Sequence, residues 1–150
     1  MLTKGYLLDV VDVRSTDGSA HKFDWVYHDD GPFSTPLPMS DWSGFPQANG
    51  YQHLTGTKSA VTGGDWKAMF GDLQFLMLGA RETRVVAGVG LGPNLQVPVP
   101  LVMARREGKS ARFVALEAPS GGASVREEGD GVYAVEFGGH TDRITVARPK

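Results

Sequence analysis

Four histidines are the first candidates for acid–base chemistry or metal binding in this 150-residue chain: His21, His28, His53 and His140. None of them falls in the HxH or HExxH spacing that places two imidazoles on one metal ion. His28 precedes two aspartates, which suits a general base beside a carboxylate and equally a strand that ends in a turn. The histidine spacing therefore indicates no metal site, and we expect no cofactor.

Other residue types with catalytic potential lack the spacing that their chemistry needs. The pair Glu127-Glu128 lies in a charged, glycine-containing turn and favours a solvated loop. Asp9 and Asp12 have an odd spacing, so they lie on opposite faces of a strand. No G-x-S-x-G sequence indicates a nucleophilic serine, and a chain without cysteine has neither a catalytic thiol nor a disulfide. The glycines of 88–92 precede proline-rich residues rather than the helix of a dinucleotide-binding loop.

Aromatic side chains are the strongest remaining candidates for ligand contact, because flat apolar rings suit the C–H faces of sugars. The alternative is that they form the core. Alternation along 21–28 favours the core for Phe23 and Trp25, whereas Trp42 and Tyr51 lie in a polar, glycine-rich stretch. We predict no catalytic residue. The predicted carbohydrate-binding residues are Trp42, Tyr51 and His53, with His28 and Trp66 as weaker candidates.

Glycine and proline divide the chain into the elements that must position these residues. The 20 glycines and 9 prolines separate β-type runs, and no helical period extends over a convincing length. This pattern predicts an all-β protein: an antiparallel β-sandwich of about nine or ten short strands in a single domain over 1–150. The expected strands are 6–13, 21–28, 66–70, 72–78, 83–89, 97–106, 110–117, 123–127, 131–137 and 142–147.

Turn residues between these runs predict how neighbouring strands pair. A turn at 15–18 predicts a hairpin of 6–13 with 21–28, and Gly108 predicts a second hairpin of 97–106 with 110–117. Residues 29–64 show no period, and a connection of this length is uncommon in a compact domain. We expect an ordered long loop there, with one short strand near Tyr51–Thr57.

Charge and hydropathy exclude several classes of partner. With 15 Lys and Arg against 17 Asp and Glu, the net charge of −2 disfavours a nucleic-acid partner. No run approaches the roughly 18 apolar residues of a membrane span, so we expect no membrane partner. The first residues lack the basic and apolar regions of a secretory signal peptide. Absence of cysteine does not decide the cellular compartment.

Three blocks of the sequence follow a family pattern of strands and turns. The blocks are YLLDVVDVRSTDGSAHKFDWVYHDDG at 6–31, the run from RVVAGVG to RFVALEAP at 84–119, and VYAVEFGGHTDRITVARP at 132–149. They cover about half of the chain. Together they resemble the β-rich C-terminal half of heparinase II/III-like polysaccharide lyases, a group that includes oligoalginate lyases.

The resemblance implies a fold and a set of functional expectations. In that family an N-terminal α/α-toroid carries most catalytic residues and packs against a β-sandwich, and the reaction is β-elimination on uronic-acid polysaccharides. Many members hold a structural zinc in the first part of the β-region. This sequence contains no toroid and begins after the segment of the zinc ligands, so neither catalytic residues nor metal ligands transfer to it. His28 matches the histidine that ends the second strand of the family pattern.

The expected function is therefore that of a non-catalytic C-terminal domain of a heparinase II/III-like lyase. It would support the missing N-terminal toroid and contact an acidic polysaccharide or oligosaccharide, and export of the parent lyase would place it in the periplasm or outside the cell. A free-standing carbohydrate-binding module is the alternative. A third possibility is a small self-sufficient β-elimination lyase, with His28 or His53 as the base and Tyr27 or Tyr51 as the acid.

Overall fold

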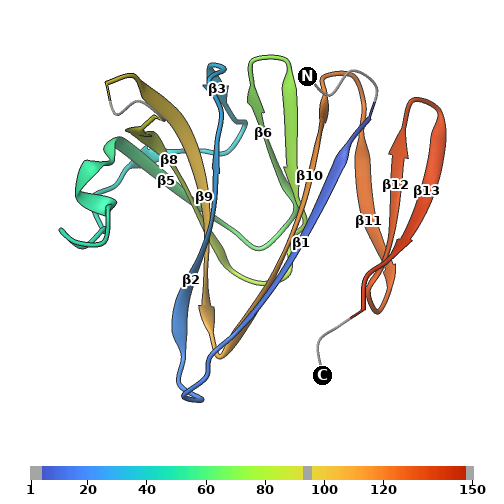
Figure 1. Ribbon diagram of the computed structural model, residues 1–150, viewed down its shortest axis with the longest axis horizontal. Helices are drawn as coiled ribbons and strands as arrows, with labels where there is room; N and C mark the ends of the chain where they lie inside the picture. Colours follow the sequence, from blue (N-terminus) through green and yellow to red (C-terminus); the bar gives the residue numbers. More distant parts are fainter. Residues whose placement is uncertain (1–4, 93–95, 148–150) are drawn as a thin grey trace.

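The computed structural model describes residues 5–92 and 96–147, and almost every element in them is a β-strand (Figure 1). The strands form three antiparallel sheets of five, five and three strands, so the predicted all-β sandwich is confirmed. No helix in this part of the chain is long and apolar enough to cross a membrane.

Sheet A lies between sheets B and C (Figure 1). In spatial order, sheet A contains β1 (Leu7–Arg14), β10 (Ser110–Pro119), β7 (Leu73–Met77), β6 (Trp66–Phe70) and β3 (Phe33–Ser34). Sheet B contains β2 (His21–His28), β9 (Pro98–Gly108), β8 (Thr83–Leu91), β5 (Thr55–Thr62) and β4 (Ser40–Asp41). Sheet C contains β11 (Ser124–Gly129), β12 (Val132–Phe137) and β13 (His140–Thr145).

Both faces of sheet A are buried, because its strands send alternate side chains to two different cores. On β10, Phe113 and Ala115 join a cluster shared with sheet B, which also contains Val102 and Ala104 of β9. The intervening residues of β10 join a second cluster with sheet C, whose buried members include Val114, Leu116, Val125, Tyr133 and Val135. The middle sheet therefore connects the two cores.

The two predicted hairpins at 6–28 and 97–117 are wrong, although the chain does reverse at both turns. β1 pairs with β10 in sheet A, whereas β2 pairs with β9 in sheet B. Each connection thus crosses between sheets, and the two crossings lie together at the lower end of Figure 1. The Ser15 N–H donates to the Lys109 carbonyl at 2.8 Å between them.

The physical reason for these crossings is burial of the apolar faces. The partly buried Val11 and Val13 of β1 and the alternating aromatic residues of β2 pack on the same cluster. Two apolar faces cover each other only when they lie in opposed layers, whereas a flat hairpin would leave both of them uncovered. Alternation itself was predicted correctly, since Phe23, Trp25 and Tyr27 all point into the space between sheets A and B.

Residues 29–64 contain more regular structure than the expected long loop. The segment holds β3, β4, a 3-10 helical turn η1 (Tyr51–His53) and the eight-residue strand β5, so the short strand expected near 51–57 is misplaced. β5 pairs with β8, and its register shifts between Thr55 and Lys58 beside Gly56. Its buried residues are the small Ser59 and Ala60, which is why hydrophobic periodicity did not reveal it.

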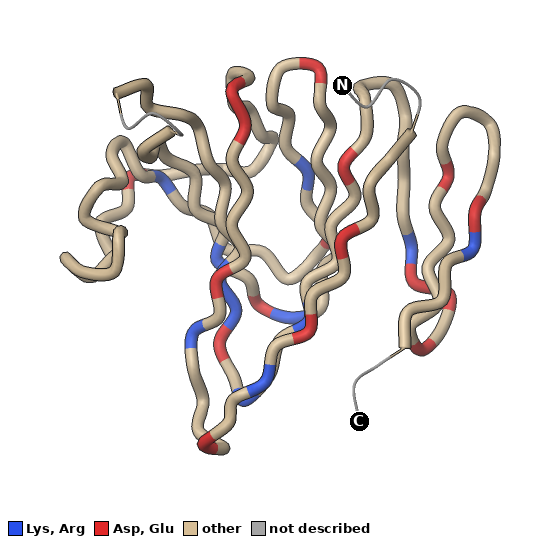
Figure 2. Tube along the Cα trace, viewed as in Figure 1, with Lys and Arg blue, Asp and Glu red and all other residues tan. Residues whose placement is uncertain are grey.

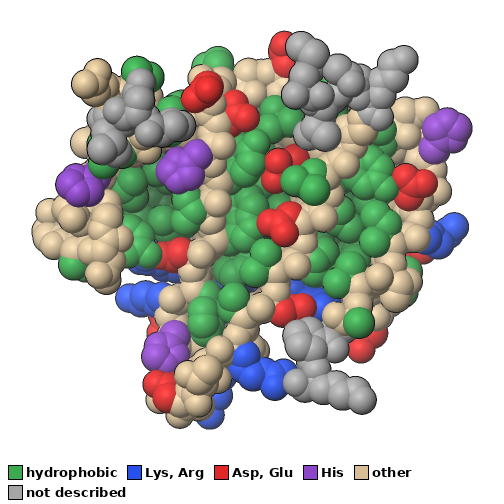
Figure 3. Space-filling view, in the orientation of Figure 1, with side chains coloured by type: hydrophobic (Ala, Val, Ile, Leu, Met, Phe, Trp, Pro, Cys, Tyr) green, Lys and Arg blue, Asp and Glu red, His purple; other side chains and the backbone are tan. Residues whose placement is uncertain are grey.

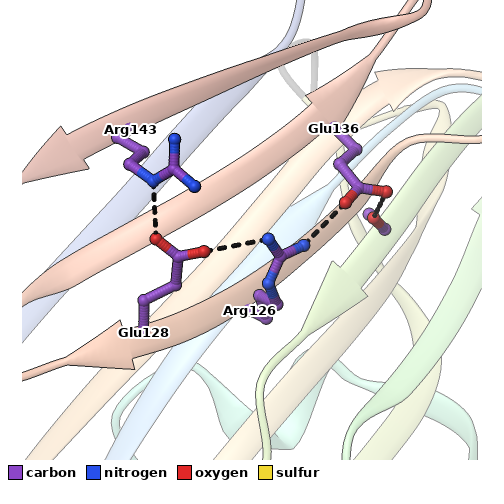
Figure 4. A network of polar contacts seen from close by, with 5 residues as sticks. Arg126, Glu128, Glu136 and Arg143 are labelled. Carbon is purple, nitrogen blue, oxygen red and sulfur yellow. Dashed lines mark hydrogen bonds and ion pairs between the residues drawn. The ribbon is translucent and has the colours of Figure 1, made fainter.

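The outer face of sheet C is polar. Arg126 forms ion pairs with Glu128 and Glu136, at 2.9 and 2.6 Å, and Arg143 joins Glu128 at 2.8 Å (Figure 4). These side chains are exposed to solvent for the most part, so the network contributes little to stability. Its position marks this face of sheet C as the solvent side of the molecule.

Candidate functional site

A groove with a volume of about 280 Å³ opens on the outer face of sheet B. Its apolar floor includes Leu101 and Met103, which point away from sheet A because β9 sends Val102 and Ala104 to the inner face. The side chains of His28, Tyr51 and His53 line it. In Figure 3, histidine side chains (purple) stand beside hydrophobic ones (green) on the sheet B side of the molecule.

Local backbone structure places these three side chains around the groove. His28 is the last residue of β2 and follows the inward-facing Tyr27, so alternation turns it outward. Tyr51 and His53 lie in η1, which begins after Asn49 and Gly50, both with positive φ values of 57° and 89°. Glycine and asparagine tolerate this conformation best, and it reverses the chain so that η1 lies over sheet B.

An aromatic cluster covers sheet B next to the groove. Phe45 stacks on Tyr51 with ring centroids 4.7 Å apart, and Trp42 contacts Phe45 edge-on at 4.6 Å. These rings, together with Leu54, pack on a buried set formed by Val86, Leu101 and Met103. The segment 42–54 thus packs on buried residues of sheet B.

An ion pair lies beneath this cluster. Arg105 Nε donates to Asp24 Oδ1 at 2.7 Å and Nη2 donates to Oδ2 at 2.6 Å, while the Tyr51 hydroxyl also donates to Oδ2. The Arg105 guanidinium lies 5.2 Å from the Phe45 ring centroid and 5.6 Å from that of Tyr51. Burial and the hydrogen bond to Asp24 raise the pKa of Tyr51, so its phenol remains a neutral donor.

The five predicted binding residues have different positions. Three of them, His28, Tyr51 and His53, line the same groove. Trp42 is half-buried and reaches the groove only through Phe45 and Tyr51, and Arg84 lies 5.5 Å from its ring centroid. Trp66, the fifth predicted residue, does not line this groove.

Trp66 lies in the core between sheets A and B, with 4% of its surface exposed. Its ring centroid is 5.2 Å from that of Phe75, and the buried side chain cannot reach a ligand on the outer face of sheet B. As the first residue of β6 it follows a polar, glycine-rich turn, and residue type alone does not distinguish a buried tryptophan there from an exposed one.

Sequence reasoning missed Asp24 and Arg105, which hold Tyr51 at the edge of the groove. They are opposite each other in the β2–β9 register, although 81 positions separate them along the chain. The sequence shows that one residue is acidic and the other basic. It did not show that β2 pairs with β9, because the predicted hairpins assigned both strands to other partners.

A separate acidic group lies between sheets A and B. Glu117 is 7% exposed, and burial together with the neighbouring Asp9 raises its pKa. Trp25 Nε1 donates to Asp9 Oδ2 at 2.9 Å, and the Tyr27 hydroxyl donates to Asp29 Oδ2 at 3.2 Å. Tyr27 therefore faces the opposite side of sheet B from the groove, so it cannot act as the acid beside a base in the groove.

Within residues 5–92 and 96–147, no group of three or more His, Asp or Glu side chains could hold a metal ion. Comparisons of this chain with protein-family models, with curated proteins and with solved structures gave no match.

Proposed function

We propose that this chain is a carbohydrate-binding β-sandwich whose groove on sheet B binds a segment of an acidic polysaccharide or oligosaccharide. One observation carries the proposal: His28, Tyr51 and His53, which come from separate parts of the sequence, line a single groove with an apolar floor. Apolar side chains suit the C–H face of a sugar ring. Imidazole N–H groups donate hydrogen bonds to hydroxyls and carboxylates, and a protonated imidazole also attracts a uronate.

The shape of the groove supports contact with a short segment of a longer chain. Its volume of about 280 Å³ is just below the range for ligand pockets, about 300–1,000 Å³, and it is open to solvent along sheet B. Val26 and Leu91, both exposed, extend its apolar lining. A small open groove of this kind suits one unit of a longer saccharide chain better than a whole enclosed ligand.

The resemblance of three sequence blocks to heparinase II/III-like lyases supports the wider part of the proposal. In that setting the sandwich is a non-catalytic C-terminal domain that supports an α/α-toroid, and the groove helps to hold the substrate chain. A free-standing carbohydrate-binding module would use the same groove without a toroid. Binding by the isolated chain is expected in both cases, so the binding experiment tests the property that they share.

Convergence of two imidazoles and a phenol also makes β-elimination by this chain a second candidate. In such a reaction an imidazole would take the C5 proton of a uronate and Tyr51 would protonate the leaving oxygen. However, the Tyr51 hydroxyl already donates a hydrogen bond to the Asp24 carboxylate. That hydrogen bond favours a positioning role for Tyr51 over a role as the acid, and binding is therefore the leading proposal.

Isothermal titration calorimetry with alginate oligosaccharides, heparin-derived oligosaccharides and neutral glucan oligosaccharides tests the proposal. We expect the acidic chains to bind and the neutral chains to bind more weakly. His28→Ala and His53→Ala should each weaken binding about tenfold, the effect of losing one charge-assisted hydrogen bond. His140→Ala is the matched control, because His140 is exposed on β13, outside the groove.

Two results would contradict these proposals in different ways. Equal affinity of the wild-type chain, His28→Ala and His53→Ala would remove the groove as the binding site, and absence of binding to all three ligand classes would remove carbohydrate binding itself. Ultraviolet absorbance of an unsaturated uronide product, formed by the wild-type chain and lost in His28→Ala or His53→Ala, would establish the enzyme over the binding module.

A further inference from the structure

A second cavity, with a volume of about 580 Å³, lies at the end of sheet A, where residues of β1, β9, β10 and β11 line it. It forms because β7 ends at Met77, opposite Ala115, while β10 continues as far as Ser110. The last main-chain contact between these segments is the Leu78 N–H donating to the Val114 carbonyl at 3.0 Å. Charged side chains on the cavity wall are Asp12, Arg14, Arg106, Arg112 and Glu127.

Arg106 is the unusual member of this wall. It is 1% exposed, and no acidic side chain pairs with it in the described part of the chain. Its Nε donates to Thr83 Oγ1 at 2.8 Å, Nη2 donates to the Leu78 carbonyl at 2.8 Å, and Nη1 donates to the Arg112 carbonyl. All three acceptors are neutral, so the buried positive charge lacks a counter-charge, an arrangement that is costly in a protein interior.

The hydrogen bonds of Arg106 also leave donors free. A guanidinium has five N–H groups, and three of them are used by the three neutral acceptors. The remaining N–H groups belong to a side chain that lines the cavity. A planar fork of this kind matches the oxygens of a carboxylate, sulfate or phosphate.

Neighbouring charges leave the cavity short of negative charge. Asp12 is engaged by Arg112, which donates to its two carboxylate oxygens at 2.8 and 2.7 Å. Glu127 accepts a hydrogen bond from the Gly131 N–H at 3.3 Å. Arg14 lines the cavity without an ion pair to any residue that the structure describes. In Figure 2, Lys and Arg (blue) and Asp and Glu (red) alternate around the end where sheets A and B meet.

Arg81 adds to this excess of positive charge. Its Nη2 donates to the Ser110 carbonyl, and Ser110 lines the cavity. Burial and the nearby Arg81 lower the pKa of Arg106. An anion in the cavity would offset both effects, because it would be attracted by Arg106, Arg14 and Arg81 together.

We propose that this cavity is a binding site for a small oxyanion group, which pairs with Arg106 and Arg14. The ligand chemistry is a carboxylate, sulfate or phosphate, either free or carried by a larger molecule. This site is independent of the carbohydrate groove, because none of the described residues lines both of them and the groove lies on the outer face of sheet B.

Thermal unfolding and calorimetry of the full chain test the site. The probes are sodium sulfate, sodium phosphate and sodium glucuronate, with sodium chloride at matched ionic strength as the reference. We expect at least one oxyanion to raise the melting temperature in a saturable way, because a ligand that binds only the folded state stabilises it. A response to glucuronate alone indicates a carboxylate ligand, and a response to sulfate or phosphate alone indicates a tetrahedral anion; both support the proposal.

Variants locate the bound anion. Arg14→Ala, at an exposed position, should weaken binding about tenfold, whereas Lys58→Ala removes one positive charge from an exposed position on sheet B and should leave binding unchanged. Arg106→Lys keeps the charge but loses the fork, so it should also weaken binding. If that variant fails to fold, Arg14→Ala still tests the site.

Two outcomes would overturn the proposal. The first is that no oxyanion stabilises the chain beyond chloride at the same ionic strength. The second is equal affinity of the wild type and Arg14→Ala. In either case Arg106 serves only to fasten β9 to the segments that accept its hydrogen bonds.

Discussion

Asp24 and Arg105 lie opposite each other on β2 and β9 and form a bidentate ion pair on the outer face of sheet B. The Asp24 carboxylate also accepts a hydrogen bond from the Tyr51 hydroxyl. The side chains are 11% and 12% exposed, so the pair is largely shielded from water by the aromatic segment above it. This arrangement connects the sheet to η1, which carries Tyr51 and His53 of the groove lining.

Replacement of Asp24 by asparagine should destabilise the chain by about 2–3 kcal/mol, because it leaves the Arg105 charge without its partner in a largely buried position. Urea unfolding followed by fluorescence measures this loss. Glu82→Gln is the control: Glu82 is exposed and outside the core, and a surface change of this kind stays within about 0.5 kcal/mol. A loss for Asp24→Asn no larger than that of the control would show that the pair is not needed to hold the segment.

Trp66→Phe should be tolerated, with a loss below about 1.5 kcal/mol, while Trp66→Ala should cost about 3–5 kcal/mol. The Trp66 Nε1 is buried and has no hydrogen-bond partner among the described residues, so phenylalanine removes an unsatisfied donor and retains most of the apolar ring. Urea unfolding measures both variants. Calorimetry should show that Trp66→Phe binds oligosaccharides with the affinity of the wild type. A large loss of affinity in this folded variant would show that Trp66 takes part in binding.

Glu117→Gln should become more stable relative to the wild type as the pH rises. Burial and Asp9 raise the pKa of Glu117 above the ordinary value of 4.5. A raised folded-state pKa means that the contribution of Glu117 is fully present below the unfolded-state pKa and is lost as the pH rises through the folded-state pKa. Glutamine stays neutral throughout and avoids that loss.

Urea unfolding of both chains, at a series of pH values from about pH 4 to about pH 8, checks this expectation. The difference in unfolding free energy should move in favour of Glu117→Gln as the pH rises above the unfolded-state pKa, and it should level off above the folded-state pKa, whereas Glu82→Gln should show no such trend. A pH-independent difference would mean that Glu117 has the same pKa in the folded and unfolded chains.

Strand positions could be predicted from the sequence far better than strand partners. The expected range 21–28 coincides with β2, because strict alternation of aromatic and polar residues is a local property. Pairing is not local. The turns before His21 and after Gly108 indicate only that the chain reverses, and the choice between a flat hairpin and a crossing depends on which apolar faces need cover.

The candidate site also combines residues that local sequence indicates with residues that only the strand pairing brings together. Residue type and a position in a polar segment were enough to select Tyr51 and His53, and the end of an alternating strand was enough for His28. Asp24 and Arg105 required the β2–β9 register. Trp66 lies apart from the groove because rings such as Phe75 on neighbouring elements bury it, and the sequence does not show which residues pack against a strand.

Pairing of β1 with β10 has a consequence for synthesis and folding. Asp12 and Arg112, which join these two strands, are separated by 100 positions. At translation rates of about 5–20 residues per second, β1 waits about 5–20 s for the strand that completes its edge of sheet A. Contacts this distant in sequence also slow refolding, to the milliseconds-to-seconds range typical of β-sandwiches. During that interval the apolar residues of β1 lack Phe113 and Ala115 of β10, with which they share a core in the folded chain.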